Sequence, residues 1–451
     1  MNKILNIIDS KIMWGPVMIV FLLGSHIYLT YKTGFVQKHL GKGIKLSLTK
    51  ENSDKGDLSV FGSLMTALSS TIGTGNIVGV GTAIVMGGPG AVFWTWIGGI
   101  FGIATKYAES YIAVKHRVKH SNGQYSGGAM TAFEKMNKPF MAKLFAVLCA
   151  LCAFGIGCAT QAASIVDIVT GTFEINRYVI AISLVILVGL VIFGGLTAIS
   201  KVCERLVPVM SIVYIVGCFY ILVMNGKYLP ETISLILSSA FTVKSAAGGF
   251  VGSTIIIAAR YGIDRGLFSN EAGMGSAPQA TASSVAKNAV KPALVGSTGV
   301  FWDTVVVCLM TGLVLVSSVI ANNDISSIGI SGANLCSACF GQIPFGSQIL
   351  VFGILTFAYS TILGWNSYGI NCCRYLFGHK SIPIYNLLWL AVVFVGSIIP
   401  ESSAWTIASI LNACMVIPNM IAVLMEKDKI AKDTKYYLDE NHLDEIDKEL
   451  A

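Results

Sequence analysis

Long apolar segments alternate with short charged loops along the whole chain. A helix needs about 20 apolar residues to cross the hydrocarbon core of a bilayer, and eleven segments approach or exceed that length. They cover approximately residues 14–31, 58–86, 90–114, 140–170, 178–199, 206–224, 233–258, 293–320, 346–370, 383–399 and 402–425. The pattern predicts an all-α integral membrane protein with about 11 transmembrane helices.

Two of these segments contain clusters of glycine. Residues 69–79 read Ser-Ser-Thr-Ile-Gly-Thr-Gly-Asn-Ile-Val-Gly, and residues 246–253 read Ala-Ala-Gly-Gly-Phe-Val-Gly-Ser. A helix that unwinds within a bilayer frees peptide groups, which are tolerated only where they line a protein cavity or bind a ligand. A pair of broken helices is typical of secondary transporters, so we expect transport.

The number of segments predicts an internal repeat. If the first span is an extra N-terminal helix, the remaining ten form two sets of five, spans 2–6 and 7–11. An odd number per set makes the second copy enter the membrane from the opposite side, which gives a 5+5 inverted repeat. The expected units are an N-terminal helix and basic loop (1–57), a first repeat (58–232), a second repeat (233–425) and a charged tail (426–451).

Composition and charge support this interpretation. The chain is 54% hydrophobic and 12% charged, with a mean hydropathy of +0.70 and a formal net charge of +7. Most lysines and arginines fall in alternate loops and in the tail, as the positive-inside rule expects for cytoplasmic segments. We therefore expect a multi-pass protein of the cell membrane with its N-terminus outside and its C-terminus in the cytoplasm, and no nucleic-acid partner.

The chemistry of a broken helix indicates a binding site. The half-helix that begins after a break presents free N–H groups to an anion such as a carboxylate, and the other half offers carbonyl oxygens to Na⁺ or an ammonium group. Close packing through the Gly75–Gly79 pair is the alternative explanation for those glycines. The predicted binding residues in the two breaks are Thr71, Gly73, Thr74, Gly75, Asn76, Gly248 and Gly249.

Three charged residues stand out near or within the spans. Asp303 lies about ten residues into span eight, so it is either part of an ion site or the partner of a structural hydrogen bond. We place Glu271 and Arg265 at the basic inner end of span seven and expect them to order a loop or an inner gate there.

The pair Cys336 and Cys339 forms a CxxC in the outer loop between spans eight and nine. One such pair cannot supply the three or four ligands of a zinc site. A disulfide and a coincidence of spacing both remain open.

Four blocks of sequence carry a specific resemblance. They are Gly73-Thr-Gly-Asn-Ile77, Gly87-Gly-Pro-Gly-Ala-Val-Phe-Trp-Thr-Trp96, Arg265-Gly-Leu-Phe-Ser-Asn-Glu-Ala-Gly-Met-Gly-Ser-Ala-Pro278 and Thr361-Ile-Leu-Gly-Trp365. Over about residues 58–420 the chain resembles the alanine or glycine:cation symporter family. The resemblance implies a leucine-transporter-type fold with an additional N-terminal helix.

The resemblance also implies roles for span nine. It assigns Thr361 and Trp365 to the substrate site, and their four-residue spacing places them on one helical face. It further implies that Ser360 and Thr361 bind Na⁺ together with carbonyls of the first broken helix. The expected Na⁺ ligands are therefore Ser360, Thr361, Asn76 and Asp303.

The function implied is uptake of a small neutral amino acid, alanine or glycine with D-alanine included, coupled to Na⁺ by alternating access. Na⁺ is then the co-transported ion, no organic cofactor is needed, and the partners are the amino acid, Na⁺ and the lipid bilayer. H⁺ coupling or a preference for glutamine is the nearest alternative. An intramembrane enzyme or a channel fits less well, and the oligomeric state stays open.

Overall fold

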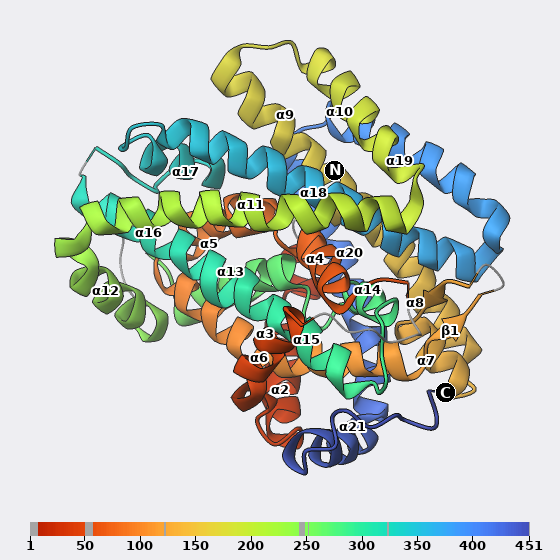
Figure 1. Ribbon diagram of the computed structural model, residues 1–451. Helices are drawn as coiled ribbons and strands as arrows, with labels where there is room; N and C mark the ends of the chain where they lie inside the picture. The colour runs from red at the N-terminus through yellow and green to blue at the C-terminus, as the bar shows by residue number, and fades with distance from the viewer. Residues whose placement is uncertain are drawn as a thin grey trace.

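The computed structural model describes residues 8–49, 57–120, 123–242, 249–250, 252–322 and 324–450, and most of them are helical (Figure 1). The first half contains α2 (Pro16–Lys32), α3 (Leu40–Ser47), α4 (Val60–Thr71), α5 (Val78–Gly87), α6 (Gly90–Lys115), α7 (Ala129–Lys135), α8 (Pro139–Cys152), α9 (Thr160–Phe173), α10 (Arg177–Ile192) and α11 (Gly195–Met224). The second half contains α12 (Leu229–Phe241), α13 (Ile255–Asn270), α14 (Pro278–Ala282), α15 (Val290–Val300), α16 (Leu309–Ala321), α17 (Gly332–Phe340), α18 (Gly346–Phe377), α19 (Ile382–Gly396), α20 (Glu401–Met425) and α21 (Lys427–Thr434).

Short irregular elements connect these helices. The strands β1 (Val118–Lys119) and β2 (Tyr125–Ser126) pair antiparallel. The 3₁₀ turns are η2 (Val36–His39), η3 (Thr74–Asn76), η5 (Gly226–Tyr228) and η7 (His379–Ser381), and the π-helical turns are η1 (Ile8–Met13), η4 (Ala153–Ala159), η6 (Phe301–Cys308) and η8 (Lys435–Asp439).

Local sequence sets several helix ends. The Ser59 side chain accepts a hydrogen bond from the Gly62 N–H at the start of α4, and Thr254 does the same for Ile257 at the start of α13. A hydroxyl in this position satisfies one of the free N–H groups of the first turn. α5 ends at Gly88, whose φ of +72° a side chain would disfavour.

The helices are those of a multi-pass membrane protein. Among the described residues, six helices are long and apolar enough to cross a membrane, or seven if the bent pair formed by α2 and residues Val36–Ser47 counts as one span. Interrupted and shorter helices fall outside that count, so eleven spans, like the inverted repeat, stay predictions. The all-α architecture agrees with the sequence.

The first predicted interruption is confirmed. α4 ends at Thr71, residues 72 and 73 are extended, η3 follows, and α5 resumes at Val78. The chain unwinds there because Thr74 and Asn76 offer side-chain hydrogen bonds that compete with the helix, and Gly73 and Gly75 lack the Cβ that favours it.

The second predicted interruption is wrong. The segment 233–258 is not one broken span, because α12 ends at Phe241 and α13 begins only at Ile255. The unwound stretch of the second half runs instead from Glu271 to Ala277, between α13 and α14. Three residues there have positive φ, Glu271 (+55°), Gly273 (+103°) and Gly275 (+73°), so the helix cannot continue.

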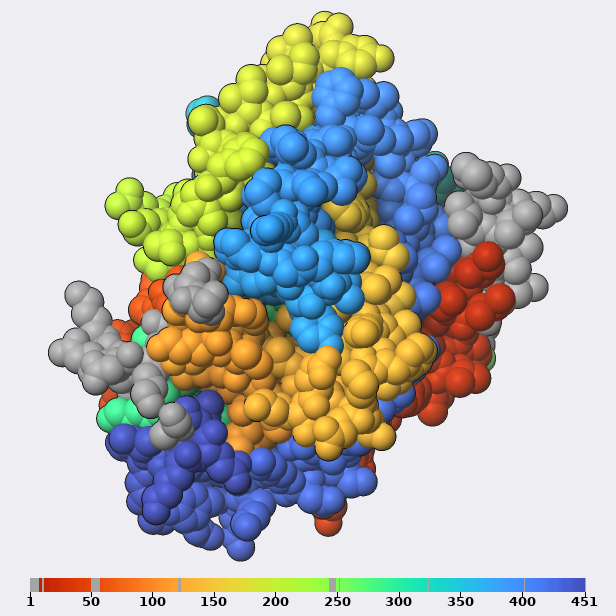
Figure 2. Space-filling view, turned by 90° about the vertical axis from the view of Figure 1, so that its right-hand side faces the viewer, coloured from red at the N-terminus to blue at the C-terminus, as the bar shows by residue number. Residues whose placement is uncertain are grey.

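The C-terminal tail folds back onto one end of the bundle, where Figure 2 shows it in dark blue at the base of the molecule. Its central contact is Lys115 at the end of α6, whose Nζ lies 2.5 Å from Asp447 Oδ2, 2.8 Å from Glu449 Oε2 and 3.8 Å from Asp433 Oδ2. The ammonium groups of Lys115 and Lys429 lower the pKa of Glu449 to about 2. This carboxylate therefore stays charged at neutral pH.

The two cysteines of the CxxC lie in α17 as buried thiols that are not joined in a disulfide. Cys336 Sγ lies 3.4 Å from the Ile77 carbonyl oxygen, and Cys339 Sγ lies 3.9 Å from that of Leu315. Because the two thiols contact different neighbouring segments, the structure favours coincidence of spacing over a disulfide.

The tail contact leads to a stability prediction. Lys115 and Asp447 have side chains only 4% and 8% exposed, so Lys115→Met leaves a buried carboxylate without its cation. Removing one partner of a buried ion pair typically costs about 3–5 kcal/mol. We expect a clearly lower unfolding temperature for the detergent-solubilised variant.

The control is Lys432→Met, which removes an exposed cation from α21. Exposed substitutions usually change stability by about 0.5 kcal/mol or less. Equal unfolding temperatures for the two variants would show that the tail contact does not stabilise the protein.

Candidate functional site

Five oxygen atoms converge where the end of α4 meets the middle of α18. Ser360 Oγ donates to the carbonyls of Ser69 (3.2 Å) and Phe357 (2.9 Å). Thr361 Oγ1 donates to the carbonyls of Ile72 (3.4 Å) and Phe357 (2.9 Å). Three carbonyls and two hydroxyls form a buried set of neutral oxygen donors, which is the ligand type that hard cations prefer.

Glycine allows the two helices to approach closely at this point. A Cβ on Gly73 would lie 2.6 Å from Thr361 Oγ1, and one on Gly364 of α18 would lie 2.8 Å from Ser69 Oγ. Both distances are shorter than a real Cβ contact, so side chains at these positions would push α4 and α18 apart. The oxygen cluster therefore depends on Gly73 and Gly364 as well as on its own ligands.

A glutamine from α9 holds the other side of the first break. Gln161 Oε1 accepts hydrogen bonds from the Thr74 N–H (3.2 Å) and from Thr74 Oγ1 (3.0 Å), while its Nε2 donates to the Ile156 carbonyl (2.9 Å). Gln161 is 1% exposed. It thus satisfies a peptide group that the unwinding of α4 sets free.

Asn76 links the first break to Asp303 in the π-helical turn η6. Its Oδ1 accepts from the Gly73 N–H (2.8 Å), and its Nδ2 donates to Asp303 Oδ1 (2.7 Å). Asp303 Oδ2 also accepts from Ser269 and Thr304, each at 2.7 Å. Both oxygens of Asp303 are occupied by protein donors, so this geometry favours the structural alternative for Asp303.

The second break is held by a buried carboxylate of α6. Glu109 Oε1 accepts from the N–H groups of Gly273 (2.8 Å) and Gly275 (3.0 Å) and from Asn419 Nδ2 of α20 (2.5 Å). A Cβ on Gly275 would lie 2.2 Å from Asn419 Oδ1, so only glycine fits there.

Lys106 sits one turn before Glu109 on α6 and completes this support. Its Nζ donates to the Glu271 carbonyl (2.7 Å) and lies 3.5 Å from Glu109 Oε2. Lys106 and Glu109 are 3% and 1% exposed. The buried pair therefore binds both a carbonyl and two N–H groups of the same unwound segment.

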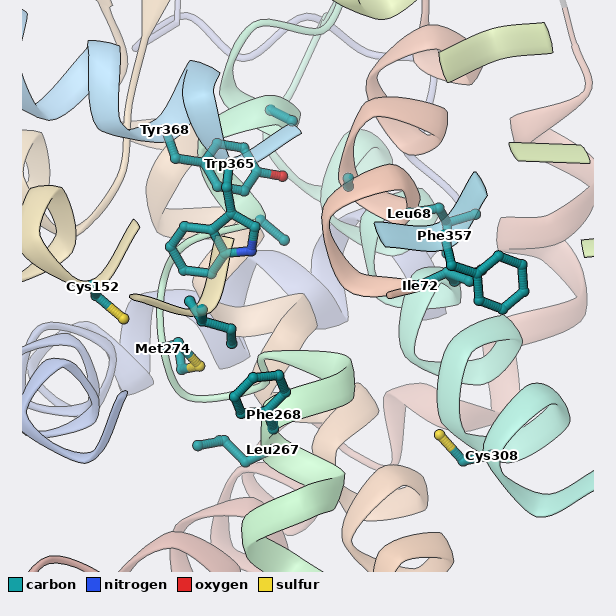
Figure 3. Close-up of a cluster of buried hydrophobic side chains, with 14 of the residues drawn as sticks. Leu68, Ile72, Cys152, Leu267, Phe268, Met274, Cys308, Phe357, Trp365 and Tyr368 are labelled. Atoms are coloured by element: carbon teal, nitrogen blue, oxygen red, sulfur yellow. The ribbon is translucent and has the colours of Figure 1, made fainter. Parts of the chain in front are cut away.

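Trp365 connects α18 to the second break. Its Nε1 donates to Glu271 Oε1 (2.8 Å), and the other carboxylate oxygen of Glu271 accepts from Ser276. The indole packs on Gly157 of η4, where an added Cβ would lie 2.2 Å from Trp365 Cβ. Figure 3 shows Trp365 beside Tyr368, with Phe268 and Met274 on the same side of the cluster.

The sequence-predicted residues divide into two groups. Those at the first break, on α18 and in η6 lie together in one buried region: Thr71, Gly73, Thr74, Gly75, Asn76, Asp303, Ser360, Thr361 and Trp365. Glu271 joins them at the second break, not in an inner loop as expected. Gly248 lies outside the described residues.

Gly249 is not part of this region. Its carbonyl accepts from the Ser327 N–H (2.8 Å) and Oγ (3.0 Å), and a Cβ would meet Val319 at 3.0 Å. It therefore belongs to the connection before α13, packed against the end of α16. The glycine cluster misled the prediction because a turn and a broken helix require the same residue.

The expected inner-gate role of Arg265 stays a prediction, and the structure places this residue away from the end of the bundle that binds the tail. Arg265 lies over the Trp405 ring (4.8 Å), and α13 packs beside Thr95, whose Oγ1 donates to the Gly262 carbonyl (2.8 Å). Thr95 is about 30 Å along α6 from Lys115, where the tail binds. Arg265 is thus near the opposite end of the bundle from the tail.

Sequence reasoning missed Gln161, Lys106 and Glu109. Each is a polar side chain within a long apolar segment, and such residues usually face the protein interior and have a function. That signal was available in the sequence. The partners of these three residues could not be predicted, because the peptide groups that they bind become free only through the tertiary fold.

Comparison with known proteins places this arrangement in a family. The family model described as the sodium:alanine symporter family matches residues 1–450. An uncharacterized transporter of Haemophilus influenzae is 41% identical over 98% of both chains. The sodium/alanine symporter AgcS of Methanococcus maripaludis is also 41% identical, over 96% of this chain and 97% of its own.

A solved structure shows the same fold despite low sequence identity. The crystal structure of MhsT in complex with L-phenylalanine superimposes with a TM-score of 0.58 and 13% identity, covering 85% of this chain and 99% of MhsT. The chain therefore belongs to the sodium:alanine symporter family, whose members are transporters and not enzymes, and it has the leucine-transporter-type fold.

Proposed function

We propose that this protein is a Na⁺-coupled symporter that carries a small neutral amino acid, alanine or glycine, into the cell by alternating access. The observation that carries the proposal is the set of five oxygens from Ser69, Ile72, Phe357, Ser360 and Thr361. A Na⁺ ion would replace the hydroxyl protons as the partner of the three carbonyls. The name of AgcS supports both the ion and the substrate.

We assign the amino acid to the buried region beside the first break, next to Thr74, Gln161, Glu271 and Trp365. The start of a half-helix and the Gln161 amide suit a carboxylate, while the Glu271 carboxylate suits an ammonium group. Trp365 occupies one wall. Binding then exchanges hydrogen bonds that these side chains make with one another for bonds to the substrate.

The decisive experiment is counterflow of labelled substrate in proteoliposomes. We expect exchange of alanine and glycine that requires Na⁺, and expect it to be lost when choline replaces Na⁺. Uptake that persists without Na⁺ and follows a pH gradient would favour H⁺ coupling instead.

A preference for glutamine is the second candidate. A relative from Bacillus subtilis named "probable sodium/glutamine symporter GlnT" is 33% identical over 96% of this chain. Competition by unlabelled glutamine in the same counterflow assay separates the two substrates. Stronger competition by glutamine than by alanine would reassign the substrate and leave the ion site in place.

The first prediction tests the ion site. Thr361→Val keeps the side-chain shape but removes one of the five oxygens. A polar contact to a charged group contributes about 1.5–3 kcal/mol. The Na⁺ concentration that gives half-maximal transport should therefore rise by about tenfold or more. Initial uptake rates measured against Na⁺ concentration give this value.

The matched control is Thr356→Val on the same helix. Among the described residues, the Thr356 hydroxyl donates to two carbonyls of its own helix, those of Phe352 (2.7 Å) and Gly353 (3.3 Å). Its Na⁺ dependence should equal that of the unmodified protein. The ion-site assignment fails if the two variants require the same Na⁺ concentration.

The second prediction distinguishes two glycines. Gly73→Ala places a methyl group 2.6 Å from Thr361 Oγ1, so it should abolish Na⁺-dependent substrate binding. Gly249→Ala strains a connection with φ +80° far from the oxygen cluster, so it should lower stability but retain substrate affinity. Binding is measured by isothermal titration calorimetry on protein verified as monodisperse. Loss of affinity in Gly249→Ala alone would contradict the location of the site.

The third prediction tests the pocket wall. Trp365→Leu removes bulk and the hydrogen bond to Glu271, so small substrates should bind more weakly while larger ones gain space. The ratio of leucine or methionine uptake to alanine uptake should rise severalfold. The ratio corrects for the amount of folded protein. An unchanged ratio would make Trp365 a packing residue only.

A further inference from the structure

A groove on the outer surface of the bundle has no role in the proposed transport site. It lies between α9, α10, α11 and α18, four helices that Figure 1 shows side by side, and has a volume of about 750 Å³. Aliphatic side chains make most of its walls: Ile180, Leu184 and Leu187 of α10, Val209 of α11 and Leu355 of α18. Small-molecule and lipid pockets commonly have this size and apolar character.

Apart from the two cations described below, three polar side chains line the groove, Ser183, Thr356 and Tyr359, and the last two are already occupied. Thr356 donates to a carbonyl of its own helix, and Tyr359 OH donates to the Leu187 carbonyl (3.0 Å). No aspartate or glutamate is among the described residues that line the groove. The aliphatic walls therefore favour a mainly apolar occupant for this part of the groove.

Two cations, Lys201 and Arg205, stand at one end of the groove. They are four residues apart on α11, so they share a helical face, and both are exposed. Within the described part of the chain neither has an ion-pair or hydrogen-bond partner. Glu204 between them points the other way, toward Ser200 Oγ (3.2 Å) and Gly62 of α4. The charge of the two cations is thus left for the occupant.

Both cations lie near one end of α11, within reach of a lipid headgroup layer. α11 has 30 residues and is about 45 Å long, enough to cross the hydrocarbon core and both headgroup layers. Lys201 and Arg205 lie about 9 and 15 Å from its first residue. Long cationic side chains at this depth extend toward the headgroup layer, where phosphates are found.

We propose that this groove is a binding site for one phospholipid with an anionic headgroup. An acyl chain lies between α10 and α11, and the phosphate pairs with Lys201 and Arg205. Charge complementarity favours a lipid over a second copy of this chain, because the exposed residues of α10 next to the groove, such as Ile182 and Ile186, are apolar and offer no anion.

The site goes beyond the proposed transport function and does not depend on it. It is nevertheless connected to that function through α18. Leu355 and Tyr359 form its wall, and the next residues, Ser360 and Thr361, turn inward to the oxygen cluster. A bound lipid would therefore support the helix that carries the ion ligands.

The test is native mass spectrometry of the delipidated full chain with phosphatidylglycerol or phosphatidylcholine added. We expect one phosphatidylglycerol to bind in preference to phosphatidylcholine. Each cation near an anionic lipid contributes a factor of about five, so the double variant Lys201→Ala/Arg205→Ala should bind phosphatidylglycerol about 25-fold more weakly. Ser183→Trp fills the groove without changing charge and should weaken both lipids.

The control is Lys143→Ala/Lys432→Ala, which removes the same charge from two exposed positions outside the groove and should leave phosphatidylglycerol binding unchanged. Equal affinity for the two lipids, or unchanged phosphatidylglycerol binding in Lys201→Ala/Arg205→Ala, would overturn the proposal. So would a lipid-free dimer that Ser183→Trp dissociates, because the occupant would then be a second copy. These measurements of lipid binding do not require transport activity, so their outcome is independent of the result of the counterflow assay.

Discussion

Unwound main chain in the interior is the constraint on which the rest of this structure depends. Each peptide group freed at residues 72–77 and 271–277 needs a partner, because an unsatisfied N–H or C=O within the membrane costs several kcal/mol. Gln161, Asn76, Lys106 and Glu109 provide these partners from three different segments, α9, η3 and α6. The two breaks therefore determine which helices must be neighbours. They also explain why polar residues occur in the core.

The two breaks are supported in different ways. The first is bound by neutral amides and hydroxyls, whereas the second is bound by the buried ion pair Lys106–Glu109. A buried pair has a high desolvation cost unless its remaining hydrogen-bonding capacity is used. Here Lys106 binds a carbonyl, and Glu109 binds two N–H groups and Asn419. The pair is thus part of the hydrogen-bonding pattern of the unwound segment.

Hydropathy predicted the helical membrane fold and most helix positions. It succeeded because the length of an apolar segment must match the thickness of the bilayer, and that length can be counted along the sequence. It failed between residues 233 and 258, where the ends of α12 and α13 together resemble one span. The second break was missed for a related reason. Glycine occurs both in the connection at Gly249 and in the break at Gly273 and Gly275, and only tertiary partners distinguish the two.

The candidate site was predicted best where the required chemistry is local. Thr74 and Asn76 are recognisable because several oxygen donors occur close together in an apolar segment, whereas Ser360 and Thr361 were expected from the family resemblance. Gln161 is a single polar residue, and its role follows from its distance to Thr74, which lies 87 positions away in the sequence. The π-helical turns η4 and η6 are likewise unpredictable from periodicity, although they bring Gly157 and Asp303 to the site.

The proposed coupling between ion and substrate follows from the geometry of α18. Thr361 lies in the oxygen cluster, and Trp365, one turn further along the same face, reaches Glu271. An ion that draws the carbonyls of Ser69 and Ile72 toward Ser360 and Thr361 also sets the position of Trp365 against the second break. Because binding free energies are reciprocally linked, a substrate that favours that position of Trp365 must strengthen ion binding by the same factor. A single rigid helix can thus couple the two sites without a longer pathway.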